Sequence, residues 1–153
     1  MGKAERKRAA VMMSSFNGER YLEEQLESIL RNTGVDIDLY IRDDGSSDGT
    51  TRILQEYSRR DHVFVQYGRH VGLGSSFMEL LWSLPDTYDY YSFSDQDDIW
   101  EKDKLITAVD RLDAESGCAL YASGVKKISA SSQSCRIVSQ FASRGAVFSS
   151  IPA

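Results

Sequence analysis

The sequence reads Ser92-Phe93-Ser94-Asp95-Gln96-Asp97-Asp98-Ile99-Trp100 at the point that decides its fold. Three carboxylates fall within four positions, directly after an aromatic, β-prone run at 88–93 and before an amphipathic helical pattern. If 88–93 is a strand of a parallel sheet, the acids lie just beyond its carboxyl end, where open α/β sheets bind ligands. Crowded carboxylates repel one another unless a cation relieves them, and their hard oxygen atoms suit Mg²⁺ or Mn²⁺ shared with phosphates. For this short pattern alone, a polar helix-capping turn is the competing interpretation.

The rest of the chain alternates strand and helix patterns. Hydrophobic periodicity and turn residues predict strands at 10–15, 37–41, 62–67, 88–93 and 118–122, and helices at 19–32, near 50–57, at 77–84 and at 101–116. Asp48 or Thr50 can cap the second helix. The alternation of Ile37, Leu39 and Ile41 with polar neighbours predicts a half-buried strand.

This order of elements predicts the fold class. Strand and helix alternate four times and a strand follows, which indicates an α/β fold with a mainly parallel sheet and helices on both faces. Residues 1–9 are expected to form a flexible lead-in and residues 10–124 one domain. Beyond Gly124 the pattern weakens, and 125–153 is expected to be a partial or truncated continuation.

Size and charge narrow the class of protein. The chain has 153 residues, enough for one good core, and its 41% hydrophobic and 27% charged content is typical of a globular domain. The formal net charge of -5 argues against nucleic acid as the main partner. The short basic start (Lys3 to Arg8) favours a solubilising tail over contact with an anionic membrane surface. Cys118 and Cys135 lack metal or redox spacing, so we expect reduced, structural cysteines in a cytoplasmic protein.

A nucleotide pocket is predicted where three loops would share one edge of the sheet. The acidic loops at Asp43-Asp44 and Asp95–Asp98 follow two strands, and a third loop at Ser14–Asn17 follows the first. Phe16 can stack on a base, one carboxylate can accept from a base N–H or a ribose hydroxyl, and another can hold the metal that neutralises a diphosphate. A core position for Phe16 and a pure turn role for Asp43 and Asp44 remain open alternatives.

Several rival motifs fail on spacing. The segment 72–77 lacks the third small residue of a dinucleotide fingerprint, and the sequence has neither a P-loop nor a Gly-x-Ser-x-Gly elbow. A calcium loop could start at Asp44, but its twelfth position is Gln55 rather than Glu. His62 and His70 have no partner at metal spacing and are interpreted as loop or strand-edge histidines.

Three ordered stretches, 11–26, 41–50 and 94–105, together resemble the family 2 inverting glycosyltransferases of the GT-A fold, in particular bacterial rhamnosyltransferase-like members. The resemblance covers 10 to about 124 and implies a Rossmann-like, nucleotide-sugar-binding half. It further implies a dTDP- or UDP-sugar donor, activated rhamnose being favoured, with Mn²⁺ or Mg²⁺ as cofactor. The acceptor would be a polysaccharide or lipid-linked glycan at the inner face of the membrane.

The resemblance also implies roles for individual residues. Ser14 and Phe16 match the loop that holds the donor base, with Phe16 in place of the usual tyrosine. Asp44 matches the carboxylate that reads the pyrimidine, and Asp43 sits beside it. In the Asp-x-Asp motif, Asp97 would ligate the metal and Asp95 would contact the ribose or the metal through water, while Asp98 orients the loop. The segment 68–76 carries His70 and Ser76 where the family often has asparagines, so no donor contact is assigned to it.

One component of the family's machinery is missing from the sequence. The general base is an Asp in the later, acceptor-binding part, and after Gly124 this sequence has no acidic residue. We therefore expect a donor-binding half that lacks the acceptor half and the base, either as a truncated chain or as one part of a complex. The alternatives are a partner-binding half-domain without its own activity, which could form a homodimer, and a Mg²⁺-dependent phosphoacceptor signalling module.

Overall fold

The computed structural model describes residues 6–117, 120–124 and 140–144, and these form a six-stranded sheet of order β3-β2-β1-β4-β6-β5. The strands are β1 (Arg8–Ser15), β2 (Asp36–Asp43), β3 (Val63–Tyr67), β4 (Tyr90–Ser94), β5 (Leu120–Ser123) and β6 (Gln140–Arg144). The helices are α1 (Leu22–Leu30), α2 (Thr50–Tyr57), α3 (Leu73–Ser83) and α4 (Lys104–Asp113). The predicted alternation of strands and helices is confirmed.

Four neighbouring strands are parallel. β1 pairs in parallel with β2 and β4, and β2 pairs in parallel with β3. Their carboxyl ends therefore meet at one edge of the sheet, called the site edge below, because parallel strands run in the same direction. The predicted mainly parallel sheet is confirmed.

The sheet continues past residue 124, which the sequence pattern did not indicate. β6 lies between β4 and β5 and is antiparallel to both. The strand predicted at 118–122 corresponds to β5, which runs from Leu120 to Ser123. Cys118 and Cys135, the two predicted structural cysteines, lie outside the described residues.

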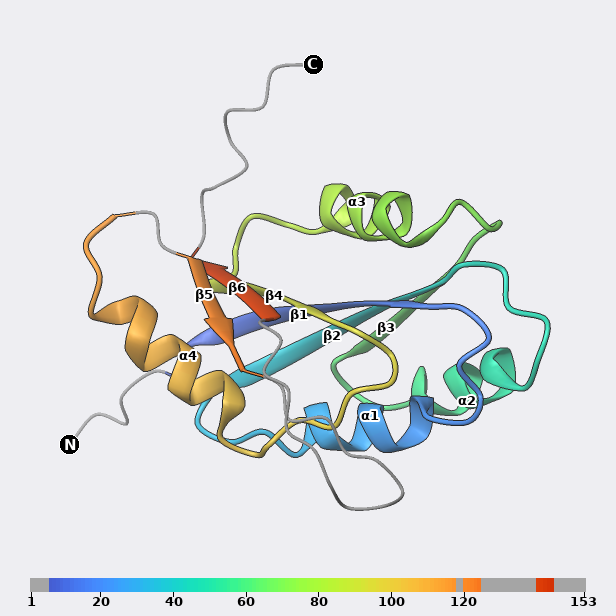
Figure 1. Cartoon of the computed structure of the whole chain (residues 1–153), viewed down its shortest axis with the longest axis horizontal. Coiled ribbons are helices and arrows are strands. Elements are labelled where there is room, and N and C mark those ends of the chain that lie inside the picture. The colour runs from blue at the N-terminus through green and yellow to red at the C-terminus, as the bar shows by residue number, and fades with distance from the viewer. Residues whose placement is uncertain (1–5, 118–119, 125–139, 145–153) are drawn as a thin grey trace.

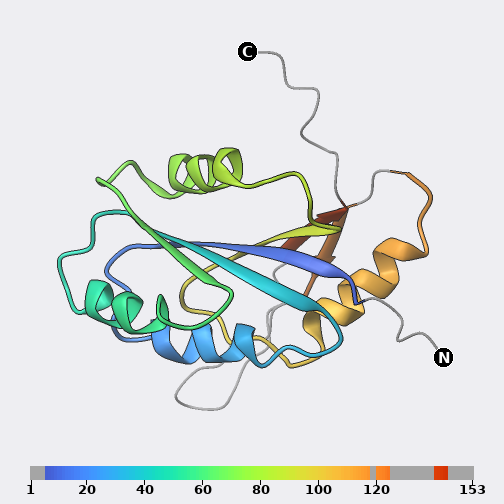
Figure 2. The same cartoon turned by 180° about the vertical axis from the view of Figure 1, so that it is seen from behind.

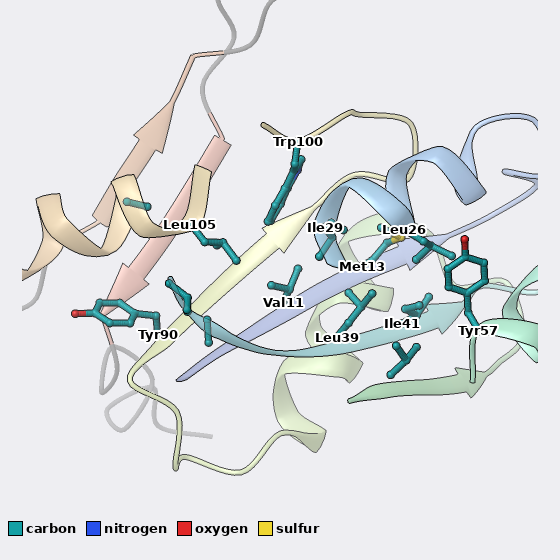
Figure 3. Close-up of a cluster of buried hydrophobic side chains, with 14 of the residues drawn as sticks. Val11, Met13, Leu26, Ile29, Leu39, Ile41, Tyr57, Tyr90, Trp100 and Leu105 are labelled. Carbon is teal, nitrogen blue, oxygen red and sulfur yellow. The ribbon is translucent and has the colours of Figure 1, made fainter. Parts of the chain in front are cut away.

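Helices cover both faces of the sheet, as predicted. In Figure 1, α3 lies on one side of the strands and α1, α2 and α4 lie on the other, and Figure 2 shows the same layers from behind. Alternate side chains of β1 serve the two layers: Val11 and Met13 pack with α1, α2 and α4, while Met12 packs with α3. Figure 3 shows the larger cluster, to which α1 contributes Leu26, β2 contributes Leu39 and the segment after β4 contributes Trp100.

Two expectations about the strands need correction. β1 begins at Arg8, inside the predicted lead-in, because Asp36 pairs with it and its backbone N–H donates to Asp89. β2 is not half-buried: Arg42 and Asp38 are only 4% and 8% exposed. The face expected to meet water is covered by α3 and by Tyr88, and both charged side chains find partners there.

No helix among the described residues is long and apolar enough to cross a bilayer.

Candidate functional site

The three loops predicted to form a pocket do meet at the site edge. Ser15, Asp43 and Ser94 are the last residues of β1, β2 and β4. The backbone N–H of Asp44 donates to the carbonyl of Ser15 at 2.8 Å, which joins the loop after β2 to the loop after β1. Asp43–Asp44 and Asp95–Asp98 thus follow strands that flank β1 on either side.

Gln96, which lies between the two acids of the Asp-x-Asp motif, ties the loop after β4 to the loop after β1. Its Oε1 accepts from Ser15 Oγ at 3.0 Å and from the Phe16 N–H at 2.9 Å, and its Nε2 donates to the Phe16 carbonyl at 3.0 Å. A Cβ at Gly18 would lie 2.4 Å from Gln96 Oε1. Sequence reasoning gave Gln96 no role, because its partners lie about 80 residues away.

A row of buried polar side chains, two on α1 and one just after its end, holds the segment between β4 and α4. Gln25, which is fully buried, donates from Nε2 to Ser94 Oγ at 2.7 Å and to the Asp95 carbonyl at 3.1 Å. Ser28 Oγ accepts from the Trp100 N–H at 2.9 Å, and Asn32 accepts from the Leu105 N–H at 3.0 Å. These residues, called the α1 polar row below, fix the path of the backbone from β4 to α4.

The acidic cluster carries more negative charge than the nearby Lys104 offsets. Asp95 and Asp97 are exposed, and no described residue donates a hydrogen bond to their carboxylates or to that of Asp98. Reduced solvation and then the charge of Asp97 raise the pKa of Asp95, while reduced solvation and then Asp95 raise the pKa of Asp98. Burial lowers the pKa of Lys104 against the pull of Asp98 and Asp95. A positive charge brought to this cluster would be stabilised.

The cluster fits a cation that is shared with a ligand. No group of three metal-ligating side chains stands ready-made among the described residues. Mg²⁺ and Mn²⁺ are commonly bound through one or two carboxylates together with phosphate oxygens and water, which is the donor set that Asp95 and Asp97 offer. The polar turn alternative does not account for these carboxylates, because α4 has no side-chain cap bond.

Asp44 lies in a buried ion-pair network. Its carboxylate is 2.5 Å from Arg42 Nη1 and accepts from the Val71 and Gly72 N–H groups at 2.9 and 2.8 Å. Burial alone would raise the pKa of Asp44, but the bonds from Val71, Arg42 and Gly72 outweigh it and hold that pKa below its ordinary value. Arg42 also contacts Glu79 at 2.7 Å, so it connects β2 to α3.

Asp43 performs turn chemistry. Its carboxylate accepts from the backbone N–H and the hydroxyl of Ser46, and Gly45 supplies a φ of 81° that most residues avoid. Asn17 Oδ1 accepts from the Ser47 N–H at 2.8 Å. Thr50 is not a cap, since its hydroxyl accepts from the Gly18 N–H; the cap position of α2 is Gly49, and Asp48 accepts from the Thr50 N–H.

The aromatic side chain at this edge is open to solvent. Phe16 is 40% exposed, which excludes the core position, and its ring lies 4.3 Å from the ring of His70. Ser14 is buried and donates to Ser76 Oγ at 2.6 Å. His70 and Ser76 thus contact Phe16 and Ser14, two of the predicted site residues, although the sequence assigned no donor contact to their segment. Their position after β3, the next parallel strand, could have indicated that they lie at the same edge of the sheet.

The protein is of the α/β class, with a mainly parallel sheet covered by helices on both faces, and solved structures share this fold. S. aureus TarS (residues 1–349) matches with a TM-score of 0.62 and 23% identity over 70% of this chain and 32% of that one. A mannosyltransferase from Pyrobaculum calidifontis matches with a TM-score of 0.65 and 22% identity over 81% and 37%. These likenesses show the GT-A type of fold.

The family follows from sequence comparison: the chain belongs to glycosyl transferase family 2, whose model matches residues 10–140. A dTDP-rhamnosyl transferase, RfbG of Shigella flexneri, is 41% identical over 105 residues, which are 65% of this chain and 36% of that protein. A teichuronic acid biosynthesis glycosyltransferase of Bacillus subtilis, TuaG, is 32% identical over 118 residues, 75% of this chain and 45% of its own length. The chain therefore spans less than half of these curated relatives.

Proposed function

We propose that this chain is the donor-binding half of an inverting glycosyltransferase that uses a nucleoside-diphosphate sugar. The observation that supports this most directly is the link through Gln96, which joins the backbone of Phe16, whose ring is exposed, to the loop that carries Asp95 and Asp97. Such a donor has a base, which can stack on an aromatic ring, and a diphosphate, which binds a cation that acids can hold.

The role proposed for each residue depends on the strand that it follows. Phe16 stacks on the base, Asp95 contacts the ribose, and Asp97, with Asp95 directly or through water, holds Mn²⁺ or Mg²⁺. Ser14, Asp43 and Asp44 shape the base end of the pocket from β1 and β2. When bound, the cation would offset the charge that develops on the departing diphosphate.

The proposed reaction is sugar transfer with inversion, in which an acceptor hydroxyl attacks the anomeric carbon as the nucleoside diphosphate leaves. The 41% identity to a dTDP-rhamnosyl transferase favours dTDP-rhamnose as the donor. The acceptor would be a polysaccharide or lipid-linked glycan, met in the cytoplasm at the inner face of the membrane. The base that takes the hydroxyl proton is not assigned to any residue of this chain.

Calorimetric titration of dTDP and UDP with and without Mn²⁺ tests the proposal. We expect binding that depends on Mn²⁺, and at about 100 times Kd a stabilisation of about 2.7 kcal/mol. For a domain of this size that corresponds to a rise in Tm of roughly 5–10 °C. Negligible heats with and without the metal would contradict the proposal.

A pair of substitutions localises the effect. Asp97→Asn should abolish the Mn²⁺-dependent rise in Tm, because it removes the proposed ligand. Asp110→Asn on the exposed face of α4 should leave it unchanged. Asp113 on the same helix would not serve as a control, because it accepts a hydrogen bond from Tyr90.

A further inference from the structure

The carboxylate of Asp44 is largely occupied by groups of the protein itself. A carboxylate offers about four lone-pair positions, two on each oxygen. Oδ1 accepts from Arg42 Nη1 and the Val71 N–H, at 2.5 and 2.9 Å. Oδ2 accepts from the Gly72 N–H at 2.8 Å, and His70 Nδ1 lies 3.0 Å from it. Asp44 is also only 1% exposed, so a base could reach it only by displacing this network.

His70 stands between Asp44 and the open part of the site. Its Nδ1 lies 3.0 Å from Asp44 Oδ2 and 3.2 Å from the Asp44 carbonyl. Both partners are acceptors, so Nδ1 carries the proton and the neutral ring has its lone pair on Nε2. The side chain is 59% exposed, and Nε2 has no hydrogen-bond partner among the described residues.

The imidazole ring of His70 also packs against the ring of Phe16. The centroids of His70 and Phe16 are 4.3 Å apart with their planes at 34°, so the two rings form a tilted pair on adjoining loops. A base that stacks on Phe16 beside the imidazole, rather than on the opposite face of Phe16, would turn its hydrogen-bonding edge toward Nε2 of His70. Single bases are commonly recognised in this way, by stacking on one aromatic residue and by hydrogen bonds to the edge.

We propose that His70 is the residue that determines base specificity, accepting through Nε2 the N3–H of thymine or uracil. Asp44 is then a positioning residue: it fixes the tautomer of His70 and the backbone path of residues 70–72. The inference rests on the proposed function, because it places the donor base against Phe16. Cytosine has an acceptor at N3, so its lone pair would face that of Nε2 and its binding would be disfavoured.

Calorimetry in Mn²⁺ with UDP, CDP and inorganic pyrophosphate tests this inference on the chain as it stands. UDP and CDP differ only in the hydrogen-bonding edge of the base. Pyrophosphate has no base, so its affinity measures binding at the metal end of the site alone. The unsubstituted chain should bind UDP at least about tenfold more tightly than CDP. His70→Ala should reduce this preference to within about threefold and leave pyrophosphate binding unchanged.

Two further variants separate the roles. His70→Phe keeps a ring against Phe16 but has no acceptor, so it should lose the preference as His70→Ala does. Asp44→Asn should lower Tm by several degrees, because it loosens the 70–72 segment. It should reduce the UDP preference only in part, because the backbone carbonyl of residue 44 still accepts from His70 Nδ1. If Asp44 read the base directly, His70→Phe would keep the preference and Asp44→Asn would remove it.

The outcomes distinguish this inference from the proposed function. Mn²⁺-dependent UDP binding without preference over CDP, or a preference that survives in both His70 variants, would overturn the role of His70 and leave the proposed function standing. Absence of binding by UDP, CDP and pyrophosphate alike would remove the proposed function and the role of His70 together.

Discussion

Two charged side chains of β2, Asp38 and Arg42, are buried toward opposite ends of the strand, and each has several partners. At the site edge, Arg42 and Asp44 pair with one another. At the opposite edge, Asp38 accepts from Tyr88 at 2.6 Å and from Arg8 at 3.0 Å, and it lies 2.6 Å from His62 Nδ1. Burial alone would raise the pKa of Asp38, but the bonds from Tyr88, His62 and Arg8 outweigh it and lower that pKa.

Asp38 should therefore make stability depend on pH in acid. A carboxyl whose pKa is lowered by folding stabilises the folded state above its unfolded pKa of about 3.9, and this contribution disappears as the pH falls through the folded-state pKa. Asp38→Asn should cost about 1–3 kcal/mol at pH 7, since it weakens charge-assisted bonds, and less near pH 3. Urea unfolding at the two pH values measures the difference.

A matched control lies on the same strand. Asp36 pairs with Arg6 at 3.6 Å, but both side chains are 59% exposed. Exposed pairs contribute about 0–1 kcal/mol, so Asp36→Asn should change stability little at either pH. Equal effects of the two substitutions would show that the Asp38 network does not stabilise the fold.

Among the elements, α1 combines two functions on one helix. Its apolar stripe, which includes Leu22, Leu26 and Ile29, packs under the sheet as the periodicity predicted. Its polar row holds the backbone that carries Asp95. A helix that only filled the core could replace these polar residues by apolar ones without changing the site.

Gln25→Leu tests the polar row. The volume is nearly kept, but Ser94 Oγ and the Asp95 carbonyl lose their donor, so we expect a loss of about 1–3 kcal/mol in unfolding free energy. Mn²⁺-dependent nucleotide binding should weaken as well, measured by calorimetry. Gln55→Leu on the exposed face of α2 should stay within about 0.5 kcal/mol of the original chain and bind normally. Unaltered binding in Gln25→Leu would show that the row serves stability alone.

Local hydrophobic patterns predicted most of the helices and strands, because the apolar residues of each one lie close together in the sequence. They also predicted which strand ends carry acids and that these ends share an edge. They missed β6, whose pairing with β4 and β5 joins segments far apart in the sequence. The α1 polar row, Gln96 and His70 were missed for the same reason: a buried amide or an imidazole takes its role from partners 26 to 81 residues away.

At the scale of the whole molecule, the aromatic end and the acidic end of the site stand on different strands of one sheet. Only short loops separate them from β1, β2 and β4, and the flanking strands are paired along their length. The direct connection between the two ends is the Gln96 amide, which bonds both backbone polar groups of Phe16. The ring and the acids are therefore held as parts of one assembly.

Through this amide, binding at the aromatic end and binding at the acidic end should be energetically coupled. Uridine carries no phosphate, so Mn²⁺ can act on it only through the protein, by way of Asp95 at the ribose and of Gln96 at Phe16; we expect Mn²⁺ to tighten uridine binding by about fivefold. By the same linkage, saturating uridine should improve Mn²⁺ affinity by an equal factor. Gln96→Ala should reduce this cooperativity to the part that Asp95 carries, whereas Gln66→Ala on β3 should preserve it in full. Uridine affinity that ignores Mn²⁺ in the original chain would mean that the two ends act independently.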